Sequence, residues 1–338
     1  MATAVEPEME NELSASLEAP AGAWPRYAAA ALGFRNYWYP VMFARSLRNK
    51  PRILTLCGEK LVLVRLAGGI QAGNARSYPV AERAGLIWVY VGDDPAPPVE
   101  DDIPDELLRP NTVVMGAVEL RKGNWRHAIE NCIDEGHAKY LHRTALSQLF
   151  KEMPVWTKGV SMAPSEDERW LCRVRGQTVA EDLYPRIGQW PRKRFWKRQL
   201  RGQPTELANR LPCLCRVGGP ARGWTAYEYF VPVDENRHRA LILAVLHTRG
   251  LGALAFRLKY WLNIYWLHYW FFNRSQDQRM VGLMNCPPER LYRPDRSITG
   301  WRKWAHETAR RAPQSPAILS RRGSPRLASE ANPCPAAG

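Results

Sequence analysis

Cysteine is scarce in this sequence and is not arranged as a disulfide framework. The 338 residues contain 7 cysteines, which are scattered singly except for Cys213 and Cys215. The first stretch, MATAVEPEMENELSASLEAPAG, has neither the charged region nor the apolar region of a secretory signal. We therefore expect the protein to lie in the reducing cytoplasm, without disulfides.

The sequence also lacks a long apolar run that is free of charge. Its most membrane-like segment, LGALAFRLKYWLNIYWLHYWFF at residues 251–272, contains Arg257 and Lys259. Each of these cations would cost about 2.5 to 3.5 kcal/mol at the centre of a bilayer. We interpret the segment as a buried or interfacial aromatic helix and do not expect the protein to bind a membrane.

Acidic residues are outnumbered, with 33 Asp and Glu against 48 Lys and Arg, which gives a formal charge of +15. Much of the excess is arginine in residues 190–202 and 310–326. No helix-turn-helix, zinc-finger or RNP pattern accompanies these stretches, so we do not expect a nucleic-acid partner. A solvated basic face or an acidic protein partner explains the charge equally well.

The pattern along the chain predicts an α+β protein in four parts. Residues 1–25 form a flexible arm, and the apolar runs that follow form a small antiparallel β unit over 26–110. A connection rich in proline and acid, at 93–110, ends this unit. A larger domain with strands and helices spans 111–312, and the Pro- and Ser-containing tail 313–338 is expected to be disordered.

The stretch NCIDEGHAKYLH, residues 131–142, contains Asp134, His137 and His142. On one regular helix the two histidines would point about 140 degrees apart, so they would not face one ion. A kink or a helix end between Gly136 and His142 would be needed. The spacing alone leaves two interpretations open, which are a metal site and a pair of exposed or capping histidines.

Two imidazoles and one carboxylate form the facial triad of non-haem Fe(II), which leaves positions open for O2. The best candidate for a third ligand is Asp277 in NRSQDQRMVGLM, because this polar patch directly follows the aromatic helix. Asp277 could equally be a solvent-facing helix residue. Asp134 could instead accept a hydrogen bond from a ligand histidine.

The stretch NWRHAIENCIDEGHAKYLH resembles the Asn-Trp-(Arg/Lys)…Glu-Asn-x2-Asp-x2-His-x4-His signature of the Rieske non-haem iron ring-hydroxylating oxygenases. The stretches LGFRNYWYPVMFA, SYPVAERAGLIWVYVGDDPAPP and YFVPVDEN resemble the subgroup that contains carbazole dioxygenase and 2-oxoquinoline monooxygenase. The resemblance covers residues 31–65, 77–145 and 225–305. It implies a helix-grip-like catalytic domain, an antiparallel sheet flanked by helices, after an all-β Rieske-like domain.

The resemblance also implies roles for single residues. His137, His142 and Asp277 match the family's Fe(II) ligands, and Asp134 matches its bridging aspartate on the electron route between subunits. Asn131 stands where the family often has an asparagine near the iron, although it could be an ordinary polar helix residue. A family member of this kind is a homotrimer that hydroxylates a hydrophobic aromatic or heteroaromatic substrate with O2. It receives electrons from a ferredoxin or a reductase.

One family feature is missing from the sequence. The Rieske [2Fe–2S] cluster needs two cysteines and two histidines, yet no cysteine here has a histidine two or three places after it. About fifty to sixty residues, the size of such a cluster-binding module, are absent at Ala72–Gly73. We therefore expect the apolar residues Leu61, Leu63 and Ile70 to be left exposed.

Two functions are compatible with a chain that has the metal-site motif but lacks the cluster ligands. The first is a terminal oxygenase whose activity is impaired by the loss of the cluster segment. The second is an inactive, cluster-free paralogue that acts as a binding or assembly subunit.

Overall fold

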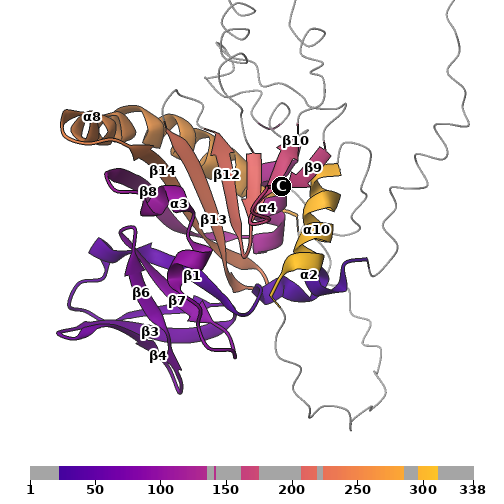
Figure 1. Ribbon diagram of the computed structural model, residues 1–338, viewed down its shortest axis with the longest axis horizontal. Helices are drawn as coiled ribbons and strands as arrows, with labels where there is room; N and C mark the ends of the chain where they lie inside the picture. Colours follow the sequence, from indigo (N-terminus) through magenta and orange to yellow (C-terminus); the bar gives the residue numbers. More distant parts are fainter. Residues whose placement is uncertain are drawn as a thin grey trace, which may run out of the picture.

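The computed structural model describes residues 23–134, 141, 161–174, 207–218, 224–284 and 296–310. The strands form three antiparallel sheets with helices packed beside them, as the predicted α+β class requires (Figure 1). Residues 1–22 of the predicted arm and the whole predicted tail, 313–338, lie outside the described residues, as do His137 and His142.

The first part of the chain builds two small sheets. One has the strand order β1-β7-β6 and the other β2-β3-β4-β5. Their strands are β1 (Tyr37–Phe43), β2 (Arg52–Leu56), β3 (Glu59–Leu66), β4 (Gly69–Gly73), β5 (Ser77–Tyr78), β6 (Val80–Arg83) and β7 (Leu86–Val91). Short helical segments accompany them, namely α2 (Pro25–Ala29), η1 (Ala30–Leu32), η2 (Ala44–Ser46), η3 (Val99–Asp102) and α3 (Asp105–Leu108).

A larger sheet follows, with the described strands in the order β8-β14-β13-β12-β11-β10-β9. They are β8 (Thr112–Lys122), β9 (Ser161–Pro164), β10 (Leu171–Val174), β11 (Leu207–Arg210), β12 (Leu214–Gly218), β13 (Thr225–Asp234) and β14 (Arg237–His247). The predicted hairpin at 223–248 is confirmed. Asp234 closes its turn by accepting hydrogen bonds from the Asn236 backbone N–H (2.9 Å) and from Arg237 Nε (2.7 Å).

A tight turn follows the position at which the sequence predicts a missing segment. Gly73 in β4 pairs with Ser77 in β5, so only three residues connect the two strands. The Asn74 side chain closes the turn, because its Oδ1 accepts from the Arg76 N–H (2.9 Å) and its Nδ2 donates to the Lys60 carbonyl (2.8 Å). The β unit therefore continues through this point as an ordinary meander.

The expected exposure of apolar residues in this unit is wrong. Leu61 and Leu63 are only 1% and 0% exposed, and Ile70 is partly buried against the same core. Successive strand residues point to opposite faces, and the face that carries Leu61 and Leu63 is covered by the rest of the β unit. The exposed apolar residues of β2 and β3 are instead Ile53, Val62 and Leu66, on the other face.

The small sheets and the large sheet share one core. The ring centroids of Trp88 in β7 and Tyr229 in β13 are 5.7 Å apart, with the rings edge to face. The backbone N–H groups of Cys57 and Gly58 donate to carbonyls of β13, the latter at 2.8 Å. The division of the chain at residue 110 therefore stays a prediction, since packing runs continuously across it.

The last described part of the chain is helical, as predicted from Leu251 onward. It consists of α8 (Leu251–Lys259), the π-helix η4 (Tyr260–Asp277), α9 (Gln278–Val281) and α10 (Arg296–Thr308). Figure 1 shows α8 beside β14 and β8, where Phe256, Tyr260 and Ile264 are buried against the large sheet. No helix in the described part of the chain is both long enough and apolar enough to span a bilayer.

A buried histidine on β14 makes the stability of the fold depend on pH. Burial lowers the pKa of His238 to about 4, while its Nδ1 lies 2.8 Å from the Gly123 carbonyl. In the unfolded chain the imidazole titrates near pH 6.5. Between this pH and about 4, the unfolded state therefore binds a proton that the folded state does not bind. Stability from this group is complete above pH 6.5 and is lost as the pH falls towards 4.

We expect a loss of about 3 kcal/mol over this interval. The variant His238→Asn keeps a donor for the carbonyl but cannot titrate, so its stability should fall less over the same pH range. Urea unfolding of both proteins between pH 6.5 and 4 measures the difference. Equal pH slopes in the two proteins would contradict the assignment.

Candidate metal centre

The helix that begins the histidine motif is α4 (Trp125–Ile133), which lies against β12 and β13 and beside α10 (Figure 1). Asn124 caps it, because its side-chain oxygen accepts from the Arg126 N–H at 3.1 Å. The helix ends at Ile133, and Asp134 has extended dihedral angles (φ −62°, ψ 120°). A helix end is therefore present at Ile133, and the kink or helix end predicted between Gly136 and His142 falls on residues outside the described ones.

Asn131 and Asp277 are brought together from positions 146 residues apart. Asn131 is buried in the last turn of α4, and Asp277 is the last residue of the π-helix η4. The Asn131 Nδ2 donates to the Asp277 Oδ1 at 3.3 Å. The contact joins the histidine motif to the carboxylate that the sequence proposed as a third ligand.

The other side of the Asn131 amide is unsatisfied. Its Oδ1 is buried and accepts no hydrogen bond from any described residue. A buried acceptor without a donor costs about 1 to 3 kcal/mol. An oxygen in this state, beside a carboxylate, suits an electropositive group such as a divalent cation or the N–H of a metal-bound imidazole.

The remaining predicted site residues are placed less fully. Asp134 is partly exposed, and its backbone N–H donates to the Glu130 carbonyl at 3.0 Å. His137 and His142 lie outside the described residues. Within the described ranges, no three His, Cys, Asp or Glu side chains form a cluster that could hold a metal.

A buried polar cluster next to Asn131 was not predicted from the sequence. Glu228 of β13 accepts from Asn273 Nδ2 (3.1 Å) and from the Cys132 thiol (3.3 Å). Arg121 of β8 donates to Asn273 Oδ1, and the residues Arg121, Glu228 and Asn273 are all buried. The only sequence signal was a charged residue at an apolar strand position in YEYFV, which does not identify its partners.

This cluster fastens α4 to the π-helix on the same side as the Asn131–Asp277 contact. Cys132 follows Asn131 directly, and Asn273 precedes Asp277 by four residues, about one helical turn. The pKa of the Cys132 thiol is raised well above its usual value by its hydrogen bond with Cys215, by burial and by the nearby charges of Glu228 and Asp277. The thiol therefore stays protonated and able to donate to Glu228.

Five of the described tryptophans lie either in the core or on the surface of the π-helix. Trp88, Trp125 and Trp301 are fully buried in the core, whereas Trp261 and Trp266 of η4 are half exposed. The described surroundings of Asp277 are polar, with Asn131 in contact and the Glu228 cluster close by.

The chain matches known oxygenases in sequence. A family model described as a homotrimeric ring hydroxylase matches residues 90–187. The terminal oxygenase component of carbazole 1,9a-dioxygenase from Sphingomonas sp is 24% identical over 366 residues, covering 84% of this chain and 94% of that protein. The corresponding component from Metapseudomonas resinovorans is 25% identical over 285 residues, covering 64% and 73%. The chain is a homologue of the Rieske-type ring-hydroxylating terminal oxygenases.

Solved structures of these oxygenases have the same fold. The terminal oxygenase of carbazole 1,9a-dioxygenase from Nocardioides aromaticivorans IC177 matches with a TM-score of 0.66 at 20% identity, over 86% of this chain and 99% of that chain. The reduced complex between oxygenase and ferredoxin in carbazole 1,9a-dioxygenase matches with a TM-score of 0.67 at 20% identity, over 91% and 96%. The helix-grip-like architecture predicted for this homologue is therefore confirmed.

The alignments also bear on the missing segment. The alignment with the Sphingomonas protein is 366 residues long, which exceeds the 338 residues of the whole chain. The oxygenase relative therefore carries residues inside the matched region that this homologue lacks. The sequence puts this difference at Ala72–Gly73, the last two residues of β4, directly before the three-residue connection to β5.

Proposed function

We propose that this chain is the terminal oxygenase component of a Rieske-type system, with Fe(II) bound by His137, His142 and Asp277. Its substrate is a hydrophobic aromatic or heteroaromatic molecule, and its second substrate is O2. The observation that carries the proposal is the contact between Asn131, in the histidine motif, and Asp277. It brings the distant carboxylate to the end of the helix that leads into both histidines.

Each residue of the proposed site has a defined task. Asp277 and the two imidazoles would hold the metal, and a bound Fe(II) would supply the means of activating O2. Asn131 donates to one oxygen of Asp277, which fixes the orientation of the carboxylate. Asp134, just beyond the helix end, is proposed as the residue that accepts a ligand-histidine N–H.

The electron supply distinguishes this chain from a complete oxygenase. Hydroxylation with O2 consumes two electrons in addition to those of the substrate C–H bond, and the chain has no residues spaced to hold a [2Fe–2S] cluster. We propose that a ferredoxin or a reductase supplies electrons to a homotrimer in the cytoplasm, and that turnover is impaired. The cluster-free binding or assembly subunit remains the second candidate, because it needs no electron path.

Turnover with a ferredoxin and reductase separates the two candidates. The homologous complete oxygenase, tested with the same aromatic substrate, provides the control for the donor proteins. We expect the Fe(II)-loaded chain to form hydroxylated product far more slowly than the control. Iron binding with no product at all, under conditions where the control turns over, would favour the binding subunit.

The absence of cluster ligands makes a spectroscopic prediction. The purified chain should show neither the visible absorption nor the EPR signal of a Rieske cluster, even after anaerobic reconstitution with iron and sulfide. The complete homologue, reconstituted in parallel, should show both. Detection of either signal in this chain would mean that the cluster segment was wrongly judged to be missing.

A further inference from the structure

One face of the long helix formed by α8 and η4 is apolar and uncovered. We call it the outer stripe, and its residues are Leu254, Leu258, Trp261, Leu262, Trp266 and Trp270. They recur every three or four residues, and Leu262 and Trp266 are 70% and 54% exposed. The opposite face of the same helix is buried on the large sheet. A continuous exposed patch of this kind marks an interaction surface.

The charge along the helix restricts what can cover the outer stripe. Residues 251–276 contain no Asp or Glu, whereas Arg257 and Lys259 are exposed beside the stripe. Arg274 is tied to Glu119 of β8, with Nε and Oε1 3.3 Å apart. In a two-fold dimer, a second copy of this chain docking stripe to stripe would bring these cations together without any carboxylate to neutralise them.

A pocket at the base of the outer stripe brings a second arginine, Arg45, to Arg257. It has a volume of about 270 Å³ and is lined by Arg45, Arg257 and Trp261 together with the start of β8. Among the described residues, neither Arg45 nor Arg257 forms an ion pair. Two guanidinium groups without a carboxylate make a pocket of this size suited to an anionic group such as phosphate.

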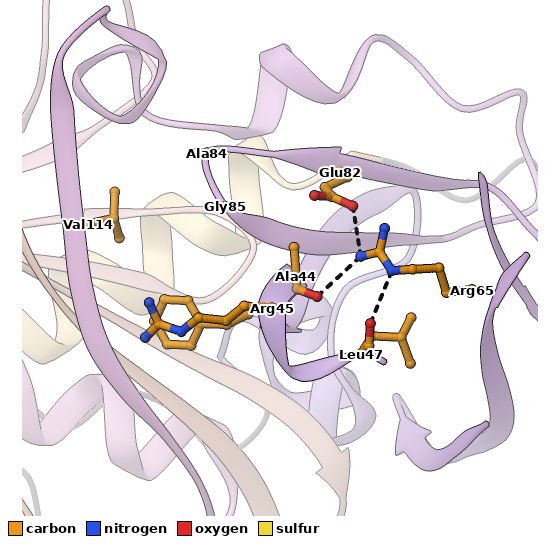
Figure 2. Close-up of a pocket in the computed structure, with 9 residues that line it drawn as sticks. Ala44, Arg45, Leu47, Arg65, Glu82, Ala84, Gly85 and Val114 are labelled. Carbon is orange, nitrogen blue, oxygen red and sulfur yellow. Dashed lines mark hydrogen bonds and ion pairs between the residues drawn. The ribbon is translucent and has the colours of Figure 1, made fainter. Parts of the chain in front are cut away.

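The neighbouring pocket has an arginine that is, in contrast, paired. It has a volume of about 500 Å³ and shares Arg45 and Val114 with the first pocket. Figure 2 shows that Arg65 in it is held by Glu82 (3.0 Å) and by the carbonyls of Ala44 and Leu47, while Arg45 stands outside this network. Of the three arginines that line the two pockets, Arg45 and Arg257 form no ion pair with a described residue, whereas Arg65 is paired with Glu82.

We propose that the outer stripe docks on the surface of an anionic lipid bilayer, with lipid phosphate groups bound between Arg45 and Arg257. Tryptophan and leucine enter the boundary between headgroups and acyl chains, and the arginines and Lys259 meet the anionic headgroups. A bilayer satisfies both the apolar and the cationic parts of this surface. The docking revises the expectation of no membrane partner, and it goes beyond the proposed oxygenase function.

Vesicle flotation of the full-length chain tests the docking. The vesicles are phosphatidylcholine alone, or phosphatidylcholine with about one third phosphatidylglycerol to provide negative charge. We expect flotation with the anionic vesicles, little with the neutral ones, and release by salt. The variants Leu262→Asp and Trp266→Asp should each lower the bound fraction about tenfold. The double variant Arg45→Gln/Arg257→Gln should lose the preference for phosphatidylglycerol.

The matched control is Ile53→Asp, at an apolar residue that is 78% exposed on β2, in the small β unit and outside the outer stripe. It should float like the unchanged chain. Binding that is absent, equal on both vesicle types, or lowered as much by Ile53→Asp as by Leu262→Asp would overturn the proposal. So would sedimentation showing that the stripe variants dissolve an oligomer, since a second copy would then be the occupant.

Discussion

Replacing Asp277 with alanine is expected to abolish stable binding of mononuclear iron. The proposed site has three protein ligands, and Asp277 is the only carboxylate among them, so its loss removes both a bond and the negative charge that favours a divalent cation. The chain is loaded with Fe(II) under anaerobic conditions and desalted, and iron per chain is measured. We expect about one iron in the unchanged protein and nearly none in Asp277→Ala.

Two further variants make this result specific to the site. His137→Ala should lose iron as completely as Asp277→Ala. Asn131→Ala removes only the hydrogen bond to Asp277, so it should weaken iron binding by about 10- to 100-fold without abolishing it. Iron content that is unchanged in Asp277→Ala would remove Asp277 from the site. An unchanged protein that binds no iron would end the oxygenase proposal itself.

Replacing Glu130 with alanine is expected to give the largest loss of stability. Glu130 is buried in α4, where Arg302 of α10 donates to both carboxylate oxygens at 2.7 and 2.8 Å. The Tyr27 hydroxyl of α2 donates to the same carboxylate at 2.7 Å. Removal of the carboxylate takes away the charge that Glu130 places against the nearly buried Arg302, together with the hydrogen bonds from Arg302 and Tyr27, which costs about 3 to 5 kcal/mol. Urea unfolding measures this loss.

The controls for Glu130 separate charge from shape. Glu130→Gln keeps the size of the side chain and one acceptor oxygen, so its loss should be smaller than that of Glu130→Ala. Glu100→Ala breaks an exposed ion pair with Arg83 and should leave the unfolding midpoint where it was. A midpoint in Glu130→Ala equal to that of Glu100→Ala would contradict the role of Glu130. Since Glu130 precedes Asn131, Glu130→Ala should also weaken iron binding.

Several features were predictable because short-range patterns decide them. The hairpin of β13 and β14 follows from two apolar runs around Asp234–Arg237, where the turn residues supply their own hydrogen bonds. The lack of cluster ligands is also a matter of sequence alone, because it depends only on which residues follow each cysteine.

Other predictions failed or were not possible. The pattern of apolar and polar residues shows which side chains share a face of a strand or helix, but it does not show which other element covers that face. Alternation in β3 separates Leu61 and Leu63 from Val62, yet only the packed β unit determines which face is buried. The helix from Leu251 is apolar on both sides, so its sequence does not reveal that one side packs on the sheet and the other is left open.

The sequence by itself determined the kind of chemistry this chain can be expected to carry, through the spacing of the motif from Asn131 to His142 and through the missing cluster ligands. Only the tertiary structure brought Asn131 to Asp277 and buried Glu228 with Asn273 and Arg121. Contacts between residues this far apart depend on how whole elements pack. Local spacing holds no information about such contacts, because the same helix and strand patterns are compatible with many arrangements.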